Sequence, residues 1–519
     1  MSFRTVGGGR QWHRVAGLAL AGLLATAVGC GDGGDATFPS DSTTATLPPR
    51  GAAVARPLIE GPVTGGKGTP FIATTTFDLA EVGYSQAEYF MSGTATAYAK
   101  VGALGSDGMW TVAPATTAAY KTRLLLYRPT DPRRFNGTVV VEWLNVSGGL
   151  DSGPDWLTGH VELIREGFAW VGVSAQKLGV EGGASLLGLP VMPLKTTDPG
   201  RYGSLVHPGD SFSYDIFSQA AQAIRRPPTV NPVSGLSVSA VIAAGESQSA
   251  FRLVTYINAV HPLADIYDGY LVHSRGGSSI SSAALSETPQ PAIMVPGAVP
   301  MRGDLNVPVL TFETEADLTF LSYVAARQAD SDRFRLWEVA GTAHADTYTV
   351  GGGSTDIGTS PDVANLILTT TVVPGFPCPV PINSGPQHFV LNAALAALNQ
   401  WVRRGTPPPI APRLDVVSGP PITISRDAHG NALGGIRTPQ LDVPIATLSG
   451  EGQTGSILCR LFGSTVPFDD TTLVALYPDH AAYVTAFDAA SDQAVSAGFL
   501  LQPDAELMKA AAAASNIAQ

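Results

Sequence analysis

The chain has 519 residues, of which 44% are hydrophobic and 14% charged, and its formal net charge is −12. A chain of this length and hydrophobic content can bury one large core or several smaller ones. Its lysines and arginines form no long run, so the sequence lacks the basic patch typical of nucleic-acid binding, and we expect no nucleic-acid partner. The excess of acidic residues mainly favours solubility.

The first 29 residues have the pattern of an export signal. Several arginines precede an apolar stretch at 15–28 that is too short to span a membrane comfortably. The small residues directly before Cys30 resemble a bacterial lipobox, in which the cysteine is lipidated and becomes the mature N-terminus. We therefore expect residues 1–29 to be a signal peptide, and Cys30 to attach an exported lipoprotein to the bacterial cell envelope, periplasmic or outer. The alternative is an ordinary signal peptide cut near Gly29.

The chain changes character at about residue 56. Residues 30–55 are mainly Gly, Asp, Ser, Thr and Pro, which cannot bury enough apolar surface to fold, so we expect a flexible tether. Residues 56–130 are rich in β-forming residues, with a strand-like run at 122–127. We expect this region to supply the first, antiparallel strands of the core.

Strand and helix patterns alternate through the middle of the chain. Apolar, largely β-branched runs predict strands at 138–144, 168–173, 238–243, 268–273, 307–312 and 333–339. Apolar residues at helical spacing predict helices at 156–166, 213–225, 251–259 and 388–403. Such alternation predicts an α/β fold with a mostly parallel central sheet flanked by helices. The last of these helices stops before a run of prolines, so we place the end of the core, 56–409, there.

Two segments lie outside this alternation. Residues 274–306 separate two core strands and are rich in Ser, Gly and Pro, with Met294, Val295 and Met301 among them. We expect them to form a loop-rich, partly apolar, lid-like insertion. Residues 410–519 show little periodicity and are expected to be a C-terminal extension that packs on the core.

The candidate nucleophile lies where a predicted strand meets a predicted helix, in a Gly-Glu-Ser-Gln-Ser turn at 245–249. A serine between small residues in a strand–turn–helix is the pattern of a nucleophile elbow, whose sharp turn exposes the hydroxyl. Ser249 replaces the second glycine of the usual pattern. A helix N-cap would explain one serine but not the strand, the glycine and the small residue together, so Ser247 is the predicted nucleophile.

The base and the acid are expected after later strands. His344 follows a predicted strand in a glycine-containing loop, a better context than that of any other histidine. The acid should follow the strand before that one, where Asp317 stands at the point at which the loop turns away. Its task is to orient the imidazole and stabilise its charged form, and Glu315 is the alternative. The order of serine, acid and histidine is that of α/β-hydrolases.

An oxyanion hole needs two backbone N–H groups. One should belong to Gln248, the residue after the nucleophile. The other should come from the glycine-rich loop 145–149 after the first parallel strand, where Val146 is the predicted donor and Ser147 the alternative. A plain glycine turn would explain this loop equally simply.

Cys378 and Cys459 remain as a pair if Cys30 carries lipid. An even pair in an oxidising compartment predicts one disulfide, and two separate buried thiols are the alternative. The cysteine spacing fits neither a redox motif nor a zinc site, so we expect no metal.

Several segments together resemble a bacterial family known simply as the alpha/beta hydrolase domain family. They are FNGTVVVEWLNVSGG, GESQSA, ETEAD, AGTAHAD and NSGPQHFVLNAALAALNQWVRRGTPPP. The resemblance runs from about residue 57 to near residue 505. It implies the fold and the Ser247, Asp317 and His344 triad of a carboxylester hydrolase, without implying a particular substrate.

The sequence therefore predicts an exported serine hydrolase that cleaves carboxylic esters through an acyl-enzyme, without a cofactor. Its substrate would be a small-molecule or lipid-like ester, and its only contact with a membrane would be the N-terminal lipid. Two alternatives remain open: an acyltransferase that uses the same triad, and a non-catalytic surface lipoprotein that has kept the fold. The intact serine, acid and histidine argue against the second.

Overall fold

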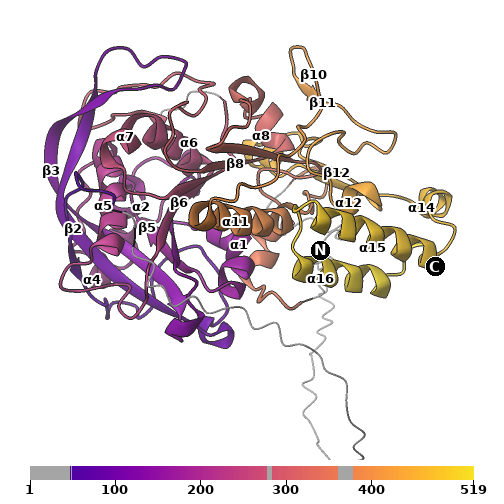
Figure 1. The fold of residues 1–519 in the computed structure, drawn as a ribbon, viewed down its shortest axis with the longest axis horizontal. Coiled ribbons are helices and arrows are strands. Elements are labelled where there is room, and N and C mark those ends of the chain that lie inside the picture. Colours follow the sequence, from indigo (N-terminus) through magenta and orange to yellow (C-terminus); the bar gives the residue numbers. More distant parts are fainter. Residues whose placement is uncertain (1–46, 48, 278–282, 361–377) are drawn as a thin grey trace, which may run out of the picture. The chain divides into compact units, whose positions relative to one another are not determined.

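Nine strands in the described part of the chain form the main β-sheet, in the order β1-β2-β3-β5-β4-β6-β7-β8-β9 (Figure 1). The structure is a computed structural model that describes residues 47, 49–277, 283–360 and 378–519. The strands are Leu58–Glu60 (β1), Tyr84–Lys100 (β2), Val112–Pro129 (β3), Thr138–Trp143 (β4), Ala169–Val173 (β5), Ala240–Glu246 (β6), Gly269–His273 (β7), Val309–Thr314 (β8) and Phe334–Val339 (β9). The first three strands are antiparallel to their neighbours, and the remaining strands run parallel. This mostly parallel sheet confirms the predicted α/β fold.

The helices of the described chain are numbered as in Figure 1. They are α1 (Pro154–Arg165), α2 (Lys177–Glu181), α3 (Leu194–Thr197), α4 (Pro199–Tyr202), α5 (Ser213–Arg225), α6 (Gln248–Thr255), α7 (His261–Ala264), α8 (Glu315–Thr319), α9 (Thr347–Val350), α11 (Gln387–Arg404), α12 (Pro439–Asp442), α13 (Ile457–Leu461), α14 (Asp470–Leu476), α15 (His480–Ser496) and α16 (Gln502–Ala514). A π-helical turn, Tyr256–Val260, joins α6 to α7. Short 3-10 turns lie at Leu79–Val82, Pro132–Arg134, Asp210–Phe212, Tyr323–Ala326 and Gly352–Ser354. Within the described residues, no helix is both long and apolar enough to cross a membrane.

Helices cover both faces of the parallel strands, which is why those strands are apolar on both sides. Val139 and Val141 of β4 belong to the apolar cluster that contains the buried residues of α5 and α6. Val140, between them, belongs to the cluster that contains those of α1 and α11. The alternation of side chains along a strand thus sends successive valines into two different layers of the core.

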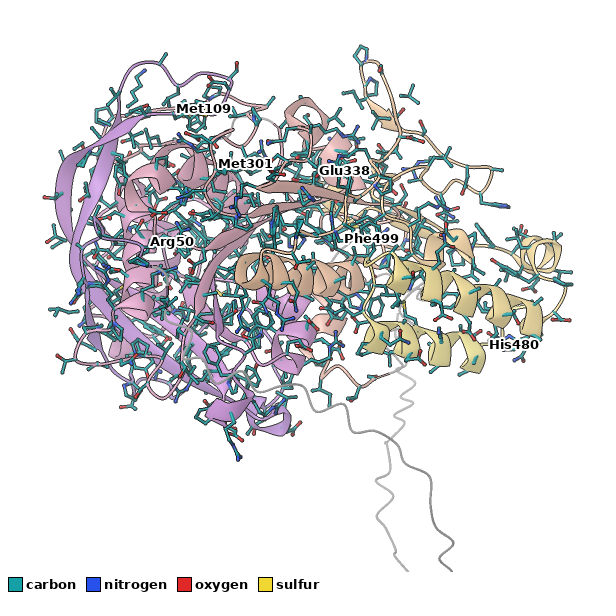
Figure 2. The ribbon with its side chains drawn as sticks, viewed as in Figure 1. Arg50, Met109, Met301, Glu338, His480 and Phe499 are labelled. Atoms are coloured by element: carbon teal, nitrogen blue, oxygen red, sulfur yellow. A yellow bond between two sulfur atoms is a disulfide. The ribbon has the colours of Figure 1, made fainter. Side chains whose placement is uncertain are left out.

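The C-terminal extension packs on the edge of the sheet beside β9. Ile436 lies alongside Val339 in parallel pairing, and Phe499 packs edge-on against Trp337 with 5.1 Å between ring centroids (Figure 2). Further on, α14, α15 and α16 contribute to an apolar cluster that also contains Tyr348 of α9 and Phe389 of α11. The α15 and α16 helices were not predicted, because many of their residues are alanines and the contrast between their faces is weak. Two small antiparallel sheets of two strands each complete the extension: Val416–Val417 (β10) with Thr423–Ile424 (β11), and Ala446–Ser449 (β12) with Ser464–Pro467 (β13).

The end of the predicted tether belongs to the folded unit, which corrects the boundary at residue 55. The chain divides into residues 1–44 and a unit of residues 45–519. Arg50 forms ion pairs with Asp265 and Asp268, and Val54 is buried in the core (Figure 2). The sequence could not predict these contacts, because the segment itself is polar and glycine-rich and its partners lie some 200 residues away in the sequence. The predicted signal peptide and Cys30 lie outside the described residues.

The predicted lid-like insertion is held against two helices where the structure describes it. The hydroxyls of Tyr214 on α5 and Thr255 on α6 donate to backbone oxygens of Ala284 and Ala283, at 2.8 and 2.6 Å. Met301 is buried and Met294 is half exposed. Residues 283–286 thus belong to the packed core, whereas several residues at 287–294 are exposed, and the lid itself stays a prediction.

Candidate active site

Ser247 occupies a sharp turn between β6 and α6. Its backbone has φ 57° and ψ −120°, a left-handed conformation that costs a non-glycine residue roughly 1–3 kcal/mol. The turn is held because the Ser247 N–H donates to the His273 carbonyl of β7 at 2.9 Å, while the Ser247 carbonyl accepts the Phe251 N–H. The surrounding structure therefore presents the serine side chain at the end of a buried strand.

Small residues on either side allow this turn to close. A Cβ atom added at Gly245 would lie 3.1 Å from both the Cβ and the backbone carbon of Ser249. That separation is tighter than ordinary contact, so glycine at 245 leaves the room that the first turn of α6 needs. Ser249 itself is fully buried, and its hydroxyl has no hydrogen-bond partner among the described residues.

The structure brings Ser247, His344 and Asp317 into one hydrogen-bonded chain. His344 Nε2 lies 2.8 Å from Ser247 Oγ, and His344 Nδ1 lies 2.6 Å from Asp317 Oδ1. With the proton on Nδ1, the imidazole donates to the carboxylate and offers its free Nε2 lone pair to the serine hydroxyl. This arrangement can remove the hydroxyl proton while the oxygen attacks an electrophile.

Hydrogen bonds to its second carboxylate oxygen hold the Asp317 side chain in place. Its Oδ2 accepts hydrogen bonds from the backbone N–H and the hydroxyl of Thr314, both at 2.7 Å, at the start of α8. The side chain is completely buried. One oxygen thus serves the helix cap, and the other is left to face His344.

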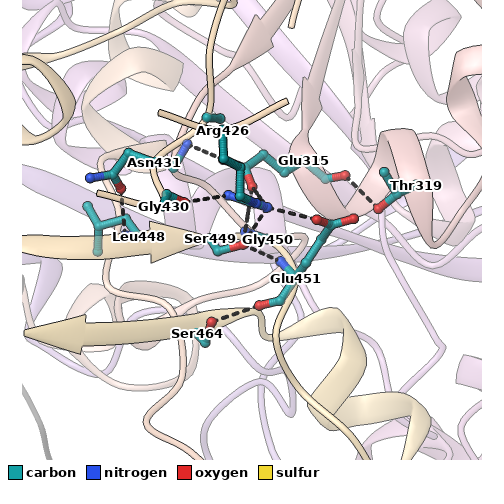
Figure 3. A network of polar contacts seen from close by, with 12 residues as sticks. Glu315, Thr319, Arg426, Gly430, Asn431, Leu448, Ser449, Gly450, Glu451 and Ser464 are labelled. Atoms are coloured by element: carbon teal, nitrogen blue, oxygen red, sulfur yellow. Dashed lines mark hydrogen bonds and ion pairs between the residues drawn. The ribbon is translucent and has the colours of Figure 1, made fainter. Parts of the chain in front are cut away.

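Glu315, the alternative acid, is directed elsewhere. Its Oε1 accepts the Gly341 N–H at 2.6 Å, and its Oε2 accepts the Arg426 guanidinium at 2.9 Å and the Gly450 N–H at 3.0 Å. Arg426 also pairs with Glu451 at 2.8 Å, and Figure 3 shows this network between α8 and the C-terminal extension. Of the two carboxylates, Asp317 is the one that contacts His344.

The pKa of His344 is raised from its ordinary value by the balance of opposing effects. Burial lowers this pKa, but the charge and hydrogen bond of Asp317, together with the charge of Glu246, raise it by more. Glu246 Oε1 lies 3.3 Å from His344 Nε2. The elbow pattern assigns no role to the residue before the serine, and the proximity of Glu246 to His344 arises from packing between distant segments.

The backbone N–H groups of both predicted oxyanion donors, Gln248 and Val146, lack a hydrogen-bond partner within the described chain, whereas that of the alternative, Ser147, has one. Gln248 is the first residue of α6, so its N–H has no partner within its own helix. In the loop after β4, the Ser147 N–H donates to Asn145 Oδ1 at 2.7 Å, whereas no hydrogen bond within the described chain engages the Val146 N–H. Val146 thus has a free amide and Ser147 does not.

Two further contacts shape the surroundings of these groups. The side-chain amide of Gln176 donates to Gln248 Oε1 at 3.0 Å and so connects the loop after β5 to the start of α6. His273 Nδ1 lies 2.9 Å from Asp155 Oδ1, at the start of α1. Burial lowers the pKa of His273 to about 4, so this second histidine is neutral near pH 7.

Cys378 and Cys459 form a disulfide, as predicted. They pack with Ile382 and Phe462 in a small apolar cluster, and the neighbouring Leu461 carbonyl accepts the Ala345 N–H at 3.3 Å. The disulfide therefore lies close to the loop that carries His344. In the described part of the chain, no cluster of three or more His, Cys, Asp or Glu side chains could hold a metal ion.

A family model with the description "Alpha/beta hydrolase domain" matches residues 59–510. Among solved structures, the chain is similar to a fungal esterase from Rhizomucor miehei, with 12% identity over 50% of this chain and 78% of that chain and a TM-score of 0.25. It is also similar to an α/β serine hydrolase without a lid from Xanthomonas campestris, with 12% identity over 48% and 86% of the two chains and a TM-score of 0.26. No curated protein sequence matches the chain.

Proposed function

Because this chain belongs to the alpha/beta hydrolase domain family, we propose that it is a serine hydrolase that cleaves carboxylic esters through an acyl-enzyme. The observation that carries the proposal is the hydrogen-bonded chain from Ser247 through His344 to Asp317. Ser247 lies on a strained turn at the end of β6. A buried, pre-oriented base beside a half-buried hydroxyl is what converts a weak serine nucleophile into a reactive one.

The reaction would begin when Ser247 Oγ attacks the ester carbonyl carbon. His344 Nε2 takes the hydroxyl proton, and the carbonyl oxygen becomes an oxyanion that would accept hydrogen bonds from the N–H groups of Gln248 and Val146. Collapse of this intermediate breaks the bond to the alcohol oxygen, which leaves with the proton from His344. Asp317 holds the imidazole orientation and stabilises its positive charge throughout.

Deacylation would repeat these steps with water. His344 removes a proton from the water molecule while the water oxygen attacks the acyl carbon. The proton then passes from His344 to Ser247 Oγ as the carboxylic acid leaves. The residues in the proposal supply every proton transfer, so the cycle consumes one ester and one water and needs no cofactor.

A fluorophosphonate probe and a panel of esters test this proposal together. We expect the probe to add mass to the peptide that carries Ser247, and the protein to hydrolyse esters of at least one acyl length and alcohol type. Ser247→Ala should abolish both while its melting temperature stays near that of the wild type. Probe labelling that persists in Ser247→Ala would disprove the assignment of the nucleophile.

We also propose that the protein is exported and attached to the cell envelope through a lipid on Cys30. The proposal rests on the arginines, the short apolar stretch and the small residues before Cys30. Acyl chains contribute about 0.8 kcal/mol for each buried CH₂ group, so several chains on one cysteine would anchor the folded unit firmly.

A further inference from the structure

Glu246 places a second carboxylate at the imidazole of His344. It is the last residue of β6, and its Oε1 lies 3.3 Å from His344 Nε2, the same nitrogen that contacts Ser247 Oγ at 2.8 Å. Asp317 contacts the other ring nitrogen. The imidazole therefore has an acidic side chain at each of its two nitrogens, and one of them shares the reacting nitrogen with the serine.

The Glu246 carboxylate is held in place rather than free in solvent. Asn145 Nδ2 donates to Glu246 Oε2 at 3.2 Å and to the Glu246 backbone carbonyl at 3.1 Å. The amide oxygen of Asn145 accepts the N–H of Ser147 in the loop that contains Val146. Only 10% of the Glu246 side chain is exposed, so its position relative to His344 is set by packing and by Asn145.

Four neighbouring titratable side chains act on the pKa of Glu246. Burial raises its pKa to about 7; His344 and His273 act to lower that pKa, and Asp155 and Asp317 act to raise it. His273 carries no charge near neutral pH, because burial lowers its pKa. Of these four groups, His344 has the largest effect on the pKa of Glu246, and its Nε2 lies 3.3 Å from the Glu246 carboxylate.

We propose that Glu246 is a positioning residue that controls the protonation of His344 through its reacting nitrogen. An ionised Glu246 favours the imidazolium, because an opposite charge within about 4–6 Å stabilises the charged form of a group. Only neutral His344 can accept the Ser247 proton, so the resting enzyme becomes active as pH rises through the raised pKa of His344. Once the imidazolium forms during attack, the same carboxylate stabilises it.

The sign of the expected effect follows from this coupling. Glu246→Gln removes the negative charge, which lowers the pKa of His344 and moves the acid limb of the activity profile to lower pH. We expect a shift of about one pH unit or more, the usual effect of a close opposite charge. Glu246→Asp keeps the charge but withdraws it by one CH₂ group, so its limb should shift in the same direction by less.

The test is the second-order rate constant for fluorophosphonate labelling of Ser247, measured from pH 5 to 9 in the wild type, Glu246→Gln and Glu246→Asp. This inference rests on the proposed function, and the readout separates the two. A wild-type protein that does not label contradicts the proposed function. A wild type and a Glu246→Gln variant that both label with the same midpoint contradict the role of Glu246 alone.

Asp346→Asn is the matched control. Asp346 is buried two residues after His344, but its carboxylate acts on His273 rather than on His344. Its Oδ1 caps α9 by accepting the N–H and hydroxyl of Thr349, and the oxygen of an asparagine can keep both bonds. We expect its midpoint to match that of the wild type. The proposal is wrong if Glu246→Gln lowers the labelling rate equally at every pH. If Glu246→Gln does not fold, an unchanged midpoint in Glu246→Asp contradicts the proposal instead.

Discussion

The Glu315 carboxylate accepts the backbone N–H of Gly341 at 2.6 Å, and so connects the helix that carries Asp317 to the loop that carries His344. The same carboxylate accepts hydrogen bonds from Arg426 and Gly450 of the C-terminal extension (Figure 3). One buried side chain therefore joins the two loops of the candidate site to the last quarter of the chain. The extension therefore helps to support the site, and the family match continues through it to residue 510.

Glu315→Gln should reduce stability more than it reduces the chemical step. A neutral amide has one acceptor oxygen where the carboxylate has two, so one set of N–H donors would be left facing an NH₂ group. Loss of buried, charge-assisted hydrogen bonds costs about 2–4 kcal/mol, which urea unfolding would measure. The kcat of the folded variant should fall less than about tenfold. A larger fall in kcat with unchanged unfolding would assign Glu315 a direct role in catalysis.

Asp317→Asn should show the opposite pattern. The amide oxygen can still accept from Thr314, which leaves the NH₂ group facing His344 Nδ1. That contact favours the tautomer with its proton on Nε2, which cannot accept the serine proton, so kcat should fall by about 10²–10⁴. The melting temperature, measured alongside, should change little. An Asp317→Asn enzyme with nearly normal kcat would contradict the proposed acid.

Two substitutions in the elbow, Ser249→Ala and Gly245→Ala, should affect the stability of the fold differently. Ser249→Ala removes a buried hydroxyl that has no partner among the described residues, so it should leave stability unchanged or raise it by up to about 1 kcal/mol. Gly245→Ala adds a Cβ atom 3.1 Å from Ser249 and Leu253, so it should destabilise the fold by about 1–3 kcal/mol and displace Ser247. Thermal unfolding and fluorophosphonate labelling measure both effects.

A double variant provides the control for that steric argument. Ser249→Gly removes the Cβ atom that the new alanine would meet, so Gly245→Ala should be milder in the Ser249→Gly background. Equal destabilisation in both backgrounds would show that Leu253 or the backbone of α6, rather than the Ser249 side chain, limits residue 245.

The sequence was most informative where the chain alternates between strand and helix. The helix expected at 213–225 coincides with α5, and the strand expected at 333–339 differs from β9 by one residue at its start. Buried parallel strands and amphipathic helices have strong periodic patterns, because each must match a fixed apolar environment. The α15 and α16 helices lack that contrast, since alanines lie on both their buried and their exposed faces.

In the candidate site, local patterns indicated Ser247, Asp317 and His344, and the structure places these three side chains in contact. Glu246 could not be found in this way, because its burial and its partners depend on Asn145 and His344, which lie about 100 residues away on either side. The sequence favoured Asp317 as the carboxylate that faces the histidine, but it kept Glu315 as the alternative. That choice depends on how α8 starts and on the Arg426 contact with Glu315.

Cys30→Ser tests the proposed attachment to the cell envelope. We expect the wild type in the membrane fraction of a bacterial host, and the variant in the soluble fraction with its activity retained. A chain that starts at residue 45 should behave like the variant. A chain that starts after residue 54 should be less stable, because it loses the ion pairs of Arg50 and the burial of Val54. Wild-type protein that is wholly soluble would contradict lipidation.

Reduction of the disulfide should lower both stability and activity. Cys378 and Cys459 are 81 residues apart, and closing a loop of this length contributes about 4 kcal/mol in the chain-entropy model. The carbonyl of Leu461, two residues after Cys459 in α13, accepts the Ala345 N–H, so loosening this region should also free the loop that carries His344. We therefore expect a reductant to lower the melting temperature and, at temperatures near the unfolding transition, the rate of ester hydrolysis.

The double variant Cys378→Ser and Cys459→Ser is the control. Its melting temperature should equal that of the reduced wild type and should not change when reductant is added. Two titratable thiols in the unreduced, denatured protein that starts at residue 45 would contradict the disulfide, and a wild-type melting temperature unmoved by complete reduction would contradict its contribution to stability.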